Sequence, residues 1–366
     1  MRYKFNEIAI NSVEKRIPTE DDKANYIGLE HLESGSLSVS TWGSAVSLKG
    51  EKLVMRKGDV LFGKRNTYLR RASIAPHDGL FSAHGMVLRP KPEVIDPSFF
   101  PFFVNSDEFF NSTIRISVGS LSPTVNWKDM KELEFDLPPI EKQRELAELL
   151  WAANDLKESY KKLIAATDEM LKAKFREMFG ERGEVVCLGE LGDWSSGGTP
   201  SRRHAEYFEG DINWYSAGEL NSVYLPPSIE KITKEAVDCS AAKIWPSGSM
   251  LVGMYDTAAL KMGILVEPSA ANQACACIQP DKSKVDLIWL RYVIEMEKED
   301  ILQKKRQGTK QKNLSLAILK EIEVPFASLS LQHAFVEIAQ KADETKTALK
   351  KSISDLDNVI KGLING

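Results

Sequence analysis

The sequence has 366 residues, of which 43% are hydrophobic and 27% charged, a composition typical of a globular protein with two or more domains. Its net charge of −4 argues against nucleic-acid binding unless positive charge is concentrated locally. No apolar run approaches the roughly 20 residues that a membrane helix needs, and residues 1–21 lack the apolar segment of a signal peptide.

The four cysteines, at positions 187, 239, 275 and 277, form no C-x-x-C pair and have no histidine partners at zinc spacing. We therefore expect no disulfide, no metal and no other cofactor, and a cytoplasmic location. The five histidines are scattered, and we interpret each as a surface or structural residue rather than a catalytic one.

Along the chain, short β-type runs punctuated by Gly, Pro, Asn and Asp alternate with long helical patterns. Typical β-type runs are 60–62 in the first half and 250–252 in the second. Each half then ends in one long helical pattern. The prediction is two compact α/β domains and two long helices, with domains at 1–137 and 183–326 and helices within 138–182 and 327–366.

The second half repeats the first at an offset of about 189 residues. GDVLFG from Gly58 matches GSMLVG from Gly248. GSLSPTVNWKDMKELEFDLPPIEKQRELAELL from Gly119 matches GTKQKNLSLAILKEIEVPFASLSLQHAFVEIA from Gly308 without a gap. Because nearly the same offset recurs in separate places, the chain is interpreted as two copies of one module.

Both long helices carry apolar or small residues at alternating steps of three and four, which is the a/d seam of a coiled coil. Two such helices in one chain can bury their seams by pairing antiparallel, with one α/β domain at each end and a pseudo-two-fold internal repeat. The alternative is that each helix packs on the surface of its own domain. The predicted fold class is α+β, and the predicted seam residues are Leu146, Leu149, Ala153, Leu156, Tyr160, Leu163, Met170, Phe335, Ile338, Ala342, Leu349, Leu356 and Val359.

Positive charge is concentrated in one short region of each copy. Seven basic residues and one acidic residue lie between Lys52 and Arg71, and five basic residues with no acidic one lie between Lys304 and Lys312. Lys and Arg neutralise phosphates, and interleaved Asn, Gln and Arg can form paired hydrogen bonds with base edges. A single cluster of this kind is usually a solvated surface, and Tyr255 is equally compatible with a core position; a cluster in each copy favours contact with DNA. The candidate DNA-binding residues of the first copy are Lys57, Lys64, Arg65, Asn66, Tyr68, Arg70, Arg71, Arg115 and Ser120. Those of the second copy are Thr199, Ser201, Arg202, Arg203, Tyr255, Asp256, Thr257, Lys304, Lys305, Arg306, Thr309, Lys310, Gln311, Lys312 and Asn313.

Three segments resemble the specificity subunits of type I restriction–modification systems. LPPIEKQRELAELL at 137–150 resembles the start of their conserved helix, SSGGTPSRRHAEYFEGDINWYSAGEL at 195–220 the start of a target-recognition domain, and QGTKQKNLSLAILKEIEVP at 307–325 its end. The resemblance implies two target-recognition domains that read a bipartite double-stranded DNA target. It also implies, as partners, two adenine-N6 methyltransferase subunits and ATP-dependent restriction subunits. The first copy departs from the pattern, because Lys15-Arg-Ile-Pro-Thr stands where the Gly-Gly-Thr-Pro opening is expected.

The motifs of a catalytic subunit are missing from the sequence. The Pro-Pro pairs at 138–139 and 226–227 lack the Asn or Asp and the aromatic residue of an adenine methyltransferase loop, and there is no G-x-x-x-x-G-K-[ST] loop for ATP. We therefore expect a non-catalytic subunit. The alternatives are a specificity module of a type II-like methylating nuclease and a coiled-coil scaffold that binds protein. Acidic residues along both helices are interpreted either as a solubilising face or as a docking surface for methyltransferase subunits.

Overall fold

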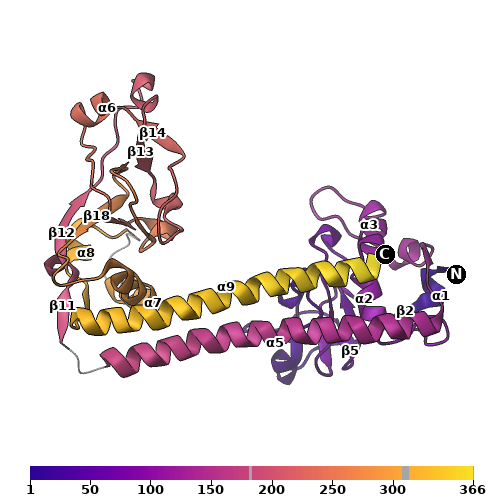
Figure 1. Cartoon of the computed structure of the whole chain (residues 1–366). Coiled ribbons are helices and arrows are strands. Elements are labelled where there is room, and N and C mark those ends of the chain that lie inside the picture. Colours follow the sequence, from indigo (N-terminus) through magenta and orange to yellow (C-terminus); the bar gives the residue numbers. More distant parts are fainter. Residues whose placement is uncertain (181–183, 307–312, 366) are drawn as a thin grey trace. The chain divides into compact units, whose positions relative to one another are not determined.

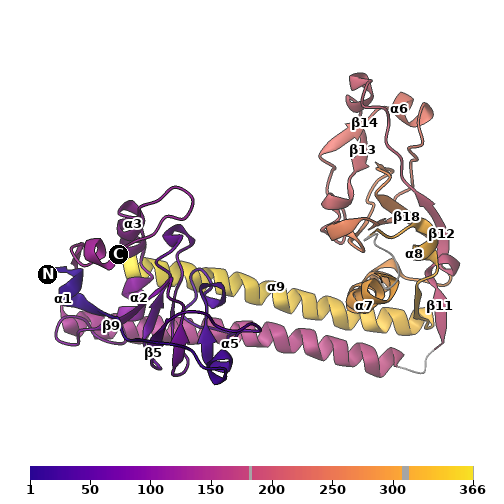
Figure 2. The ribbon, with the colours of Figure 1, turned by 180° about the vertical axis from the view of Figure 1, so that it is seen from behind.

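The chain divides into two compact units (Figures 1 and 2). The computed structural model describes residues 1–180, 184–306 and 313–365, and leaves aside the side chains of Asp256 and of 304–306. One unit combines Met1–Lys162 with Leu349–Gly366, and the other is Leu163–Ala348. Each long helix therefore contributes to both units. The domain boundaries predicted from the sequence, 1–137, 138–182, 183–326 and 327–366, stay a prediction.

The first unit contains two four-stranded sheets and a two-stranded ribbon. One sheet has the antiparallel order β2-β9-β6-β7, the other has the order β3-β5-β8-β4 with β4 parallel to β8, and β1 pairs with β10. Its strands are β1 (Arg2–Lys4), β2 (Ala9–Ser12), β3 (Lys15–Arg16), β4 (Tyr26–Ile27), β5 (Lys52–Met55), β6 (Val60–Phe62), β7 (Ala72–Ile74), β8 (Gly79–Phe81), β9 (Met86–Pro90) and β10 (Glu134–Asp136). Its short helices are α1 (Phe5–Ile8), α2 (Phe100–Val104), α3 (Asp107–Arg115) and α4 (Trp127–Met130), with 3₁₀ turns η1 (Asp21–Asn25), η2 (Leu29–His31) and η3 (Thr67–Leu69).

The second unit has its own four-stranded antiparallel sheet, in the order β12-β18-β15-β16. A three-stranded sheet β14-β13-β17 and a ribbon of β11 with β19 accompany it. The strands are β11 (Val185–Cys187), β12 (Gly192–Ser196), β13 (Ile212–Tyr215), β14 (Glu230–Ile232), β15 (Met250–Gly253), β16 (Met262–Ile264), β17 (Ala270–Ala271), β18 (Cys275–Pro280) and β19 (Glu323–Pro325). The helices are the short α6 (Lys234–Asp238) and α8 (Leu316–Lys320) and the 20-residue α7 (Leu287–Arg306), with 3₁₀ turns η4 (Leu188–Glu190), η5 (Ala205–Phe208), η6 (Ala217–Glu219) and η7 (Asp256–Ala258).

The antiparallel four-stranded sheets that contain β6 and β15 share one strand order, around a central strand that is buried on both faces. In β6, Val60 and Phe62 belong to one apolar cluster and Leu61 to another, because successive side chains of a strand point to opposite faces. In β15, Met250 and Leu251 divide in the same way between two clusters. The equivalent strand orders confirm the internal repeat predicted from the sequence.

The two long helices are α5 (Ile140–Phe179) and α9 (Leu329–Asn365). Within the first unit, the start of α5 runs antiparallel to the end of α9: Lys157 pairs with Asp357 at 2.8 Å, and Ile364 packs against the cluster that contains Leu150. Within the second unit, Lys346 pairs with Asp168 at 2.8 Å, and the rings of Phe179 and Phe335 lie 5.5 Å apart. In the described part of the chain, no helix combines the length and apolarity needed to cross a membrane.

The seam predicted on α5 is displaced by one residue from the row that is buried. The exposed side chains Leu149, Leu156, Leu163 and Met170 contradict that prediction, while each following residue, Leu150, Lys157, Ile164 and Leu171, is buried or half-buried. On α9, Phe335 and Ala342 are buried and Leu349 and Leu356 half-buried, but Val359 is 51% exposed. Leu146, Ala153, Tyr160 and Ile338 are half-buried. The buried row includes Asn154, Lys157 and Asp168, so it is less apolar in the sequence than the leucine row beside it.

Each long helix is fastened to its unit by a buried glutamine in its first turn. Gln143 donates from Nε2 to the carbonyl oxygens of Pro138 (2.9 Å) and Val94 (3.3 Å), and its Oε1 accepts from the backbone N–H of Asp96 (2.8 Å). Gln332 repeats the arrangement in the second unit, with the carbonyls of Ala327 and Lys284 and the N–H of Asp286, all at 2.8 Å. Both side chains are fully enclosed, so these bonds fix the start of each helix against the loop that precedes α2 or α7.

Candidate nucleic-acid interface

A hairpin loop follows the central strand β6 of the first unit. The backbone N–H of Gly63 donates to the carbonyl of Arg71 at 2.9 Å and closes the loop. Inside it, η3 is flanked by Asn66 (φ 54°) and Arg70 (φ 49°), both in the left-handed region that residues with side chains rarely adopt. The loop from Lys64 to Arg71 therefore has a defined conformation, anchored on a doubly buried strand.

A second surface segment, 116–125, pairs with this loop. The N–H of Val125 donates to the carbonyl of Lys64 at 3.0 Å, and the N–H of Asn66 donates to the carbonyl of Pro123 at 2.7 Å. Arg65 forms an antiparallel bridge with Thr124, and its guanidinium donates to the Ser122 hydroxyl at 3.3 Å. Segments about 50 residues apart in the sequence thus form one edge, which we call the recognition edge of the first unit.

The recognition edge gathers seven of the predicted residues, and Arg115 lies directly before its second segment, at the end of α3; the seven are Lys64, Arg65, Asn66, Tyr68, Arg70, Arg71 and Ser120. Arg65, Arg115 and Ser120 are exposed, and the Tyr68 side chain is 55% exposed. Such a surface presents guanidinium, hydroxyl and aromatic groups together, which suits contact with phosphates and base edges. Lys57 does not belong to it, because Lys57 precedes β6 whereas Lys64 follows that strand.

The second unit repeats this geometry. The N–H of Gly253 donates to the carbonyl of Lys261 at 2.8 Å, and Leu260 is left-handed (φ 58°), as Arg70 is in the first unit. The N–H of Leu314 donates to the carbonyl of Met254 at 2.8 Å, the counterpart of the Val125–Lys64 bond. The hairpin loop 254–261 is therefore bridged to the segment that precedes α8, as its counterpart is to the segment that precedes α4. We call this loop and the described residues 313–315 the recognition edge of the second unit.

Several predicted residues of the second copy lie on or beside this edge. Tyr255 is 38% exposed, and Thr257 and Asn313 are exposed. Lys304, Lys305 and Arg306 form the last residues of α7, whereas Thr309, Lys310, Gln311 and Lys312 lie outside the described residues, as does the side chain of Asp256.

The Gly-Gly-Thr-Pro turn leaves the sheet at the same end as this hairpin. Gly197 donates its N–H to the carbonyl of Cys275 at 2.9 Å, and Cys275 is also the register partner of Gly253. A Cβ on Gly197 would lie 2.2 Å from the carbonyl oxygen of Asn272, so only glycine allows this approach. The turn then leads to the exposed residues Thr199, Ser201, Arg202 and Arg203.

Comparison with known proteins decides the family. Residues 3–166 and 181–356 each match the family model described as type I restriction modification DNA specificity domain. The chain belongs to this family. By this membership it is a non-catalytic specificity chain with two specificity domains, as the repeat and the missing catalytic motifs predict.

The relatives of the specificity chain are themselves specificity subunits. It is 26% identical over 191 residues to the Escherichia coli EcoR124I/EcoR124II specificity subunit, a match that covers 51% of this chain and 46% of that relative. It is 22% identical over 378 residues to the putative MjaX specificity subunit of Methanocaldococcus jannaschii, covering 94% of this chain and 86% of the relative.

Two solved structures share the fold of the specificity chain. The type I S subunit from M. genitalium has a TM-score of 0.58 at 14% identity, with 100% of this chain and 94% of that one covered. A chain solved in work on complex assembly and conformational transition of the type I R-M system has a TM-score of 0.62 at 19% identity, covering 100% and 96%.

Two of the predicted cations in the specificity chain are already held by protein groups, and a third is half-buried. The Arg70 guanidinium bonds the Asp107 carboxylate and lies 5.2 Å from the centre of the Phe110 ring. Arg71 donates to the carbonyl of Leu29 at 2.9 Å, and burial lowers the pKa of its guanidinium. Burial also lowers the pKa of Lys64, which is half-buried. These three residues are therefore less available to DNA than Arg65.

Arg202 of the second unit is held more firmly. It makes two bonds to Glu230, at 2.6 and 2.7 Å, and lies 4.1 Å from the Phe208 ring centre and 5.3 Å from that of Trp214. The paired hydrogen bonds raise the pKa of Arg202 and lower that of Glu230. Arg203, beside it, is exposed, and no salt bridge to its guanidinium occurs among the described residues.

The structure adds residues to the recognition edge that the sequence analysis missed. Leu121 is 96% exposed and Val118 is 59% exposed, both on the segment that pairs with the hairpin loop. Positive charge and side-chain amides are the features that indicate a DNA-binding residue in the sequence, and these two apolar residues have neither. Within the described residues, no group of three or more His, Cys, Asp or Glu side chains is arranged to hold a metal ion.

Proposed function

We propose that the chain reads a split double-stranded DNA target, with one half contacted by each recognition edge. The observation that carries the proposal is the repeated pairing of a hairpin loop that contains a left-handed residue with a second surface segment, at the positions where basic, hydroxyl and amide side chains gather. Membership of the specificity family supports it. Because the two edges differ in sequence, the two half-sites differ as well.

The chemistry of the edges separates affinity from sequence reading. Exposed cations such as Arg65, Arg115 and Arg203 would neutralise phosphates, a contribution that weakens with salt. Tyr68, which is 55% exposed, would offer its hydroxyl group to base edges. Arg71 and Arg202, which already have protein partners, would shape the edges rather than contact bases.

The long helices fit the role of a spacer. We propose that α5 and α9, within 138–182 and 327–366, pair antiparallel along their length and hold the domains 1–137 and 183–326 in a pseudo-two-fold arrangement. Half-sites read in this way would lie about one helical turn of DNA, roughly 34 Å, apart. The antiparallel ion pairs found within each unit support the pairing.

The partners in this proposal are two adenine-N6 methyltransferase subunits, joined by ATP-dependent restriction subunits, in the cytoplasm. In this proposal the chain recognises the DNA sequence and the partner subunits catalyse the reactions. This division agrees with the names of its relatives as specificity subunits. The acidic outer faces of the two helices, which include Glu145 and Asp355, are the proposed methyltransferase contact.

The deciding experiment is a methylome. The chain is co-expressed with its methyltransferase partner in a host that lacks N6-methyladenine, and the genome is sequenced for modified adenine. We expect a new bipartite motif that is absent when the chain is omitted. A stable complex with the methyltransferase but no motif would contradict the proposal.

A second measurement addresses the recognition edge itself. Arg65→Ala should weaken DNA binding by the assembled complex and reduce the slope of log K against log salt by about one, because one phosphate contact is lost. The control is Arg176→Ala, which changes an exposed arginine on α5. Equal salt slopes for the two variants would remove Arg65 from the interface.

A further inference from the structure

Arg70 combines a backbone and a side chain that are both constrained. Its φ of 49° lies in the left-handed region, directly after the 3₁₀ turn η3. A residue with a side chain seldom keeps this conformation unless its surroundings hold it there. The contacts of the Arg70 side chain stabilise this backbone conformation, since the guanidinium bonds the Asp107 carboxylate and lies over the Phe110 ring.

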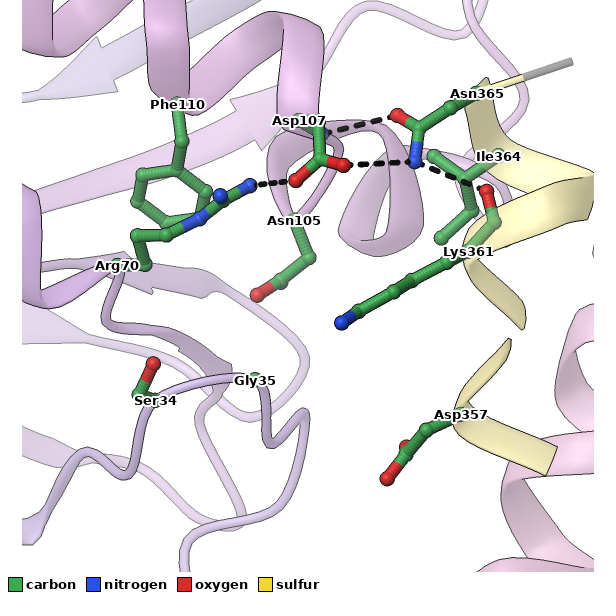
Figure 3. Close-up of a pocket in the computed structure, with 10 residues that line it drawn as sticks. All are labelled: Ser34, Gly35, Arg70, Asn105, Asp107, Phe110, Asp357, Lys361, Ile364 and Asn365. Carbon is green, nitrogen blue, oxygen red and sulfur yellow. Dashed lines mark hydrogen bonds and ion pairs between the residues drawn. The ribbon is translucent and has the colours of Figure 1, made fainter. Parts of the chain in front are cut away.

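Asp107 has a second partner on the opposite side, the end of the long helix α9 (Figure 3). Its backbone N–H donates to Oδ1 of Asn365 at 3.0 Å, and Nδ2 of Asn365 donates to the Asp107 carboxylate at 3.4 Å. Nδ2 of Asn365 also donates to the carbonyl of Lys361 at 2.9 Å, which fixes the amide on its own helix. Asp107 therefore connects Arg70 of the hairpin loop to Asn365 of α9.

The connection borders a cavity of about 320 Å³, lined also by Ser34, Gly35 and Lys361 (Figure 3). Phe110 and Ile364 also line this cavity, and beside them the helix end and the loop are linked through the polar bonds of Asp107. Polar bonds of this kind demand defined positions of both partners, so a change at one end is transmitted to the other.

The second unit holds its loop differently. Leu260 occupies the position of Arg70 and is also left-handed (φ 58°), but it is an apolar residue that is 1% exposed within the main cluster of that unit. At this position apolar packing takes the place of the Arg70–Asp107 ion pair, and the neighbouring Lys261 donates to Asn221 at 3.0 Å. The link from helix to loop is thus a property of the first unit, and the second unit is an internal control.

We propose that Asn365 and Asp107 are positioning residues, which act through Arg70 to hold the hairpin loop Lys64–Arg71 in the conformation that reads the first DNA half-site. This inference rests on the proposed function. It reassigns Arg70 from a DNA contact to part of the support, and it makes the end of α9 a determinant of specificity for one half-site only.

The test uses the complete complex of this chain with its methyltransferase partner. The half-site of the first domain is identified by exchanging residues 1–137 for those of another family member. Methylation is then measured on targets with single-base changes in each half-site. For Asn365→Ala we expect discrimination in the first half-site to fall about 3- to 10-fold, the effect of losing hydrogen bonds to a charged and a backbone group. Discrimination in the second half-site should not change.

A double-mutant cycle separates this link from general loss of structure. Asp107→Asn should reproduce the effect of Asn365→Ala, and the double variant should be no worse than either single one, because both substitutions break the same chain of contacts. Asn358→Ala, the same change at an exposed position of α9, is the matched control and should retain full discrimination.

The outcomes decide between the two proposals. Wild-type complex without any bipartite motif would refute the proposed function. A wild-type motif with unchanged first-half discrimination in Asn365→Ala would overturn the positioning role alone. Equal losses in both half-sites, or additive losses in the double variant, would also overturn it, since they indicate a general structural effect.

Discussion

Substitution of the buried glutamine Gln143 by leucine should destabilise the first unit, because it removes the hydrogen bonds that hold the start of α5. Leucine has similar bulk but neither donates nor accepts, so three hydrogen bonds of 2.8, 2.9 and 3.3 Å are lost. The carbonyls of Pro138 and Val94 and the N–H of Asp96 would lack their partner. Each unsatisfied group costs about 1–3 kcal/mol, and water can reach the half-buried loop in part, so we expect a loss of about 3 kcal/mol.

The assay is hydrogen exchange of core amides in each unit. A loss of about 3 kcal/mol lowers protection in β9 by roughly a hundredfold. Gln332→Leu should do the same to β18 in the second unit, and somewhat more strongly, because all three of its bonds measure 2.8 Å. Gln340→Leu, at an exposed position of α9, is the control. A change below about fivefold for Gln143→Leu would refute the reasoning, since it would mean that these bonds contribute no more than ordinary surface ones.

Three further predictions concern ionisable side chains. The Lys157 side chain is 7% exposed and its ammonium group pairs with Asp357. Asp357→Asn should therefore destabilise the chain by about 1–3 kcal/mol in urea unfolding, whereas Lys157→Met should be nearly neutral. A larger loss for Lys157→Met than for Asp357→Asn would refute the electrostatic argument. Burial raises the pKa of Cys275 from about 9 to about 12, so its thiol stays neutral in the folded chain after the unfolded one ionises, and the urea midpoint should fall as pH rises above about 9. At pH 8 a thiol reagent should label exposed Cys239 but neither Cys275 nor Cys277 before unfolding.

The repeat and the strands of the central sheets could be predicted from the sequence because they depend on local patterns. GDVLFG and GSMLVG each give a doubly buried strand after a left-handed glycine turn at Gly58 or Gly248. The seam of α5 could not be located in this way. Its buried row contains Lys157 and Asp168, whose ion partners lie on α9 far along the sequence, so a search for apolar residues selects the exposed leucines one position earlier.

The division of the basic residues into free and occupied ones is also invisible in the sequence. Arg65 and Arg70 stand five residues apart in one cluster, yet Arg65 is exposed and Arg70 is bound by Asp107. Pairing with a carboxylate 37 residues away depends on how α3 packs against the hairpin, which no periodicity encodes. The sequence also gives no sign that Leu121 belongs to the recognition edge, since nothing in its residue type predicts a 96% exposed side chain.

The composition of the two units has a consequence for the order in which they can fold. Residues 163–348 supply every segment of the second unit, so it can complete its contacts as one continuous stretch while synthesis is still in progress. The first unit needs residues 349–366 to cover the apolar cluster around Leu150. These residues are synthesised only after the more than 180 residues of the second unit, so the first unit cannot complete its core before then. Closing so long a loop is slow, and until then the apolar face of α5 in that unit remains open to solvent. The N-terminal unit, although made first, is therefore the last to be finished.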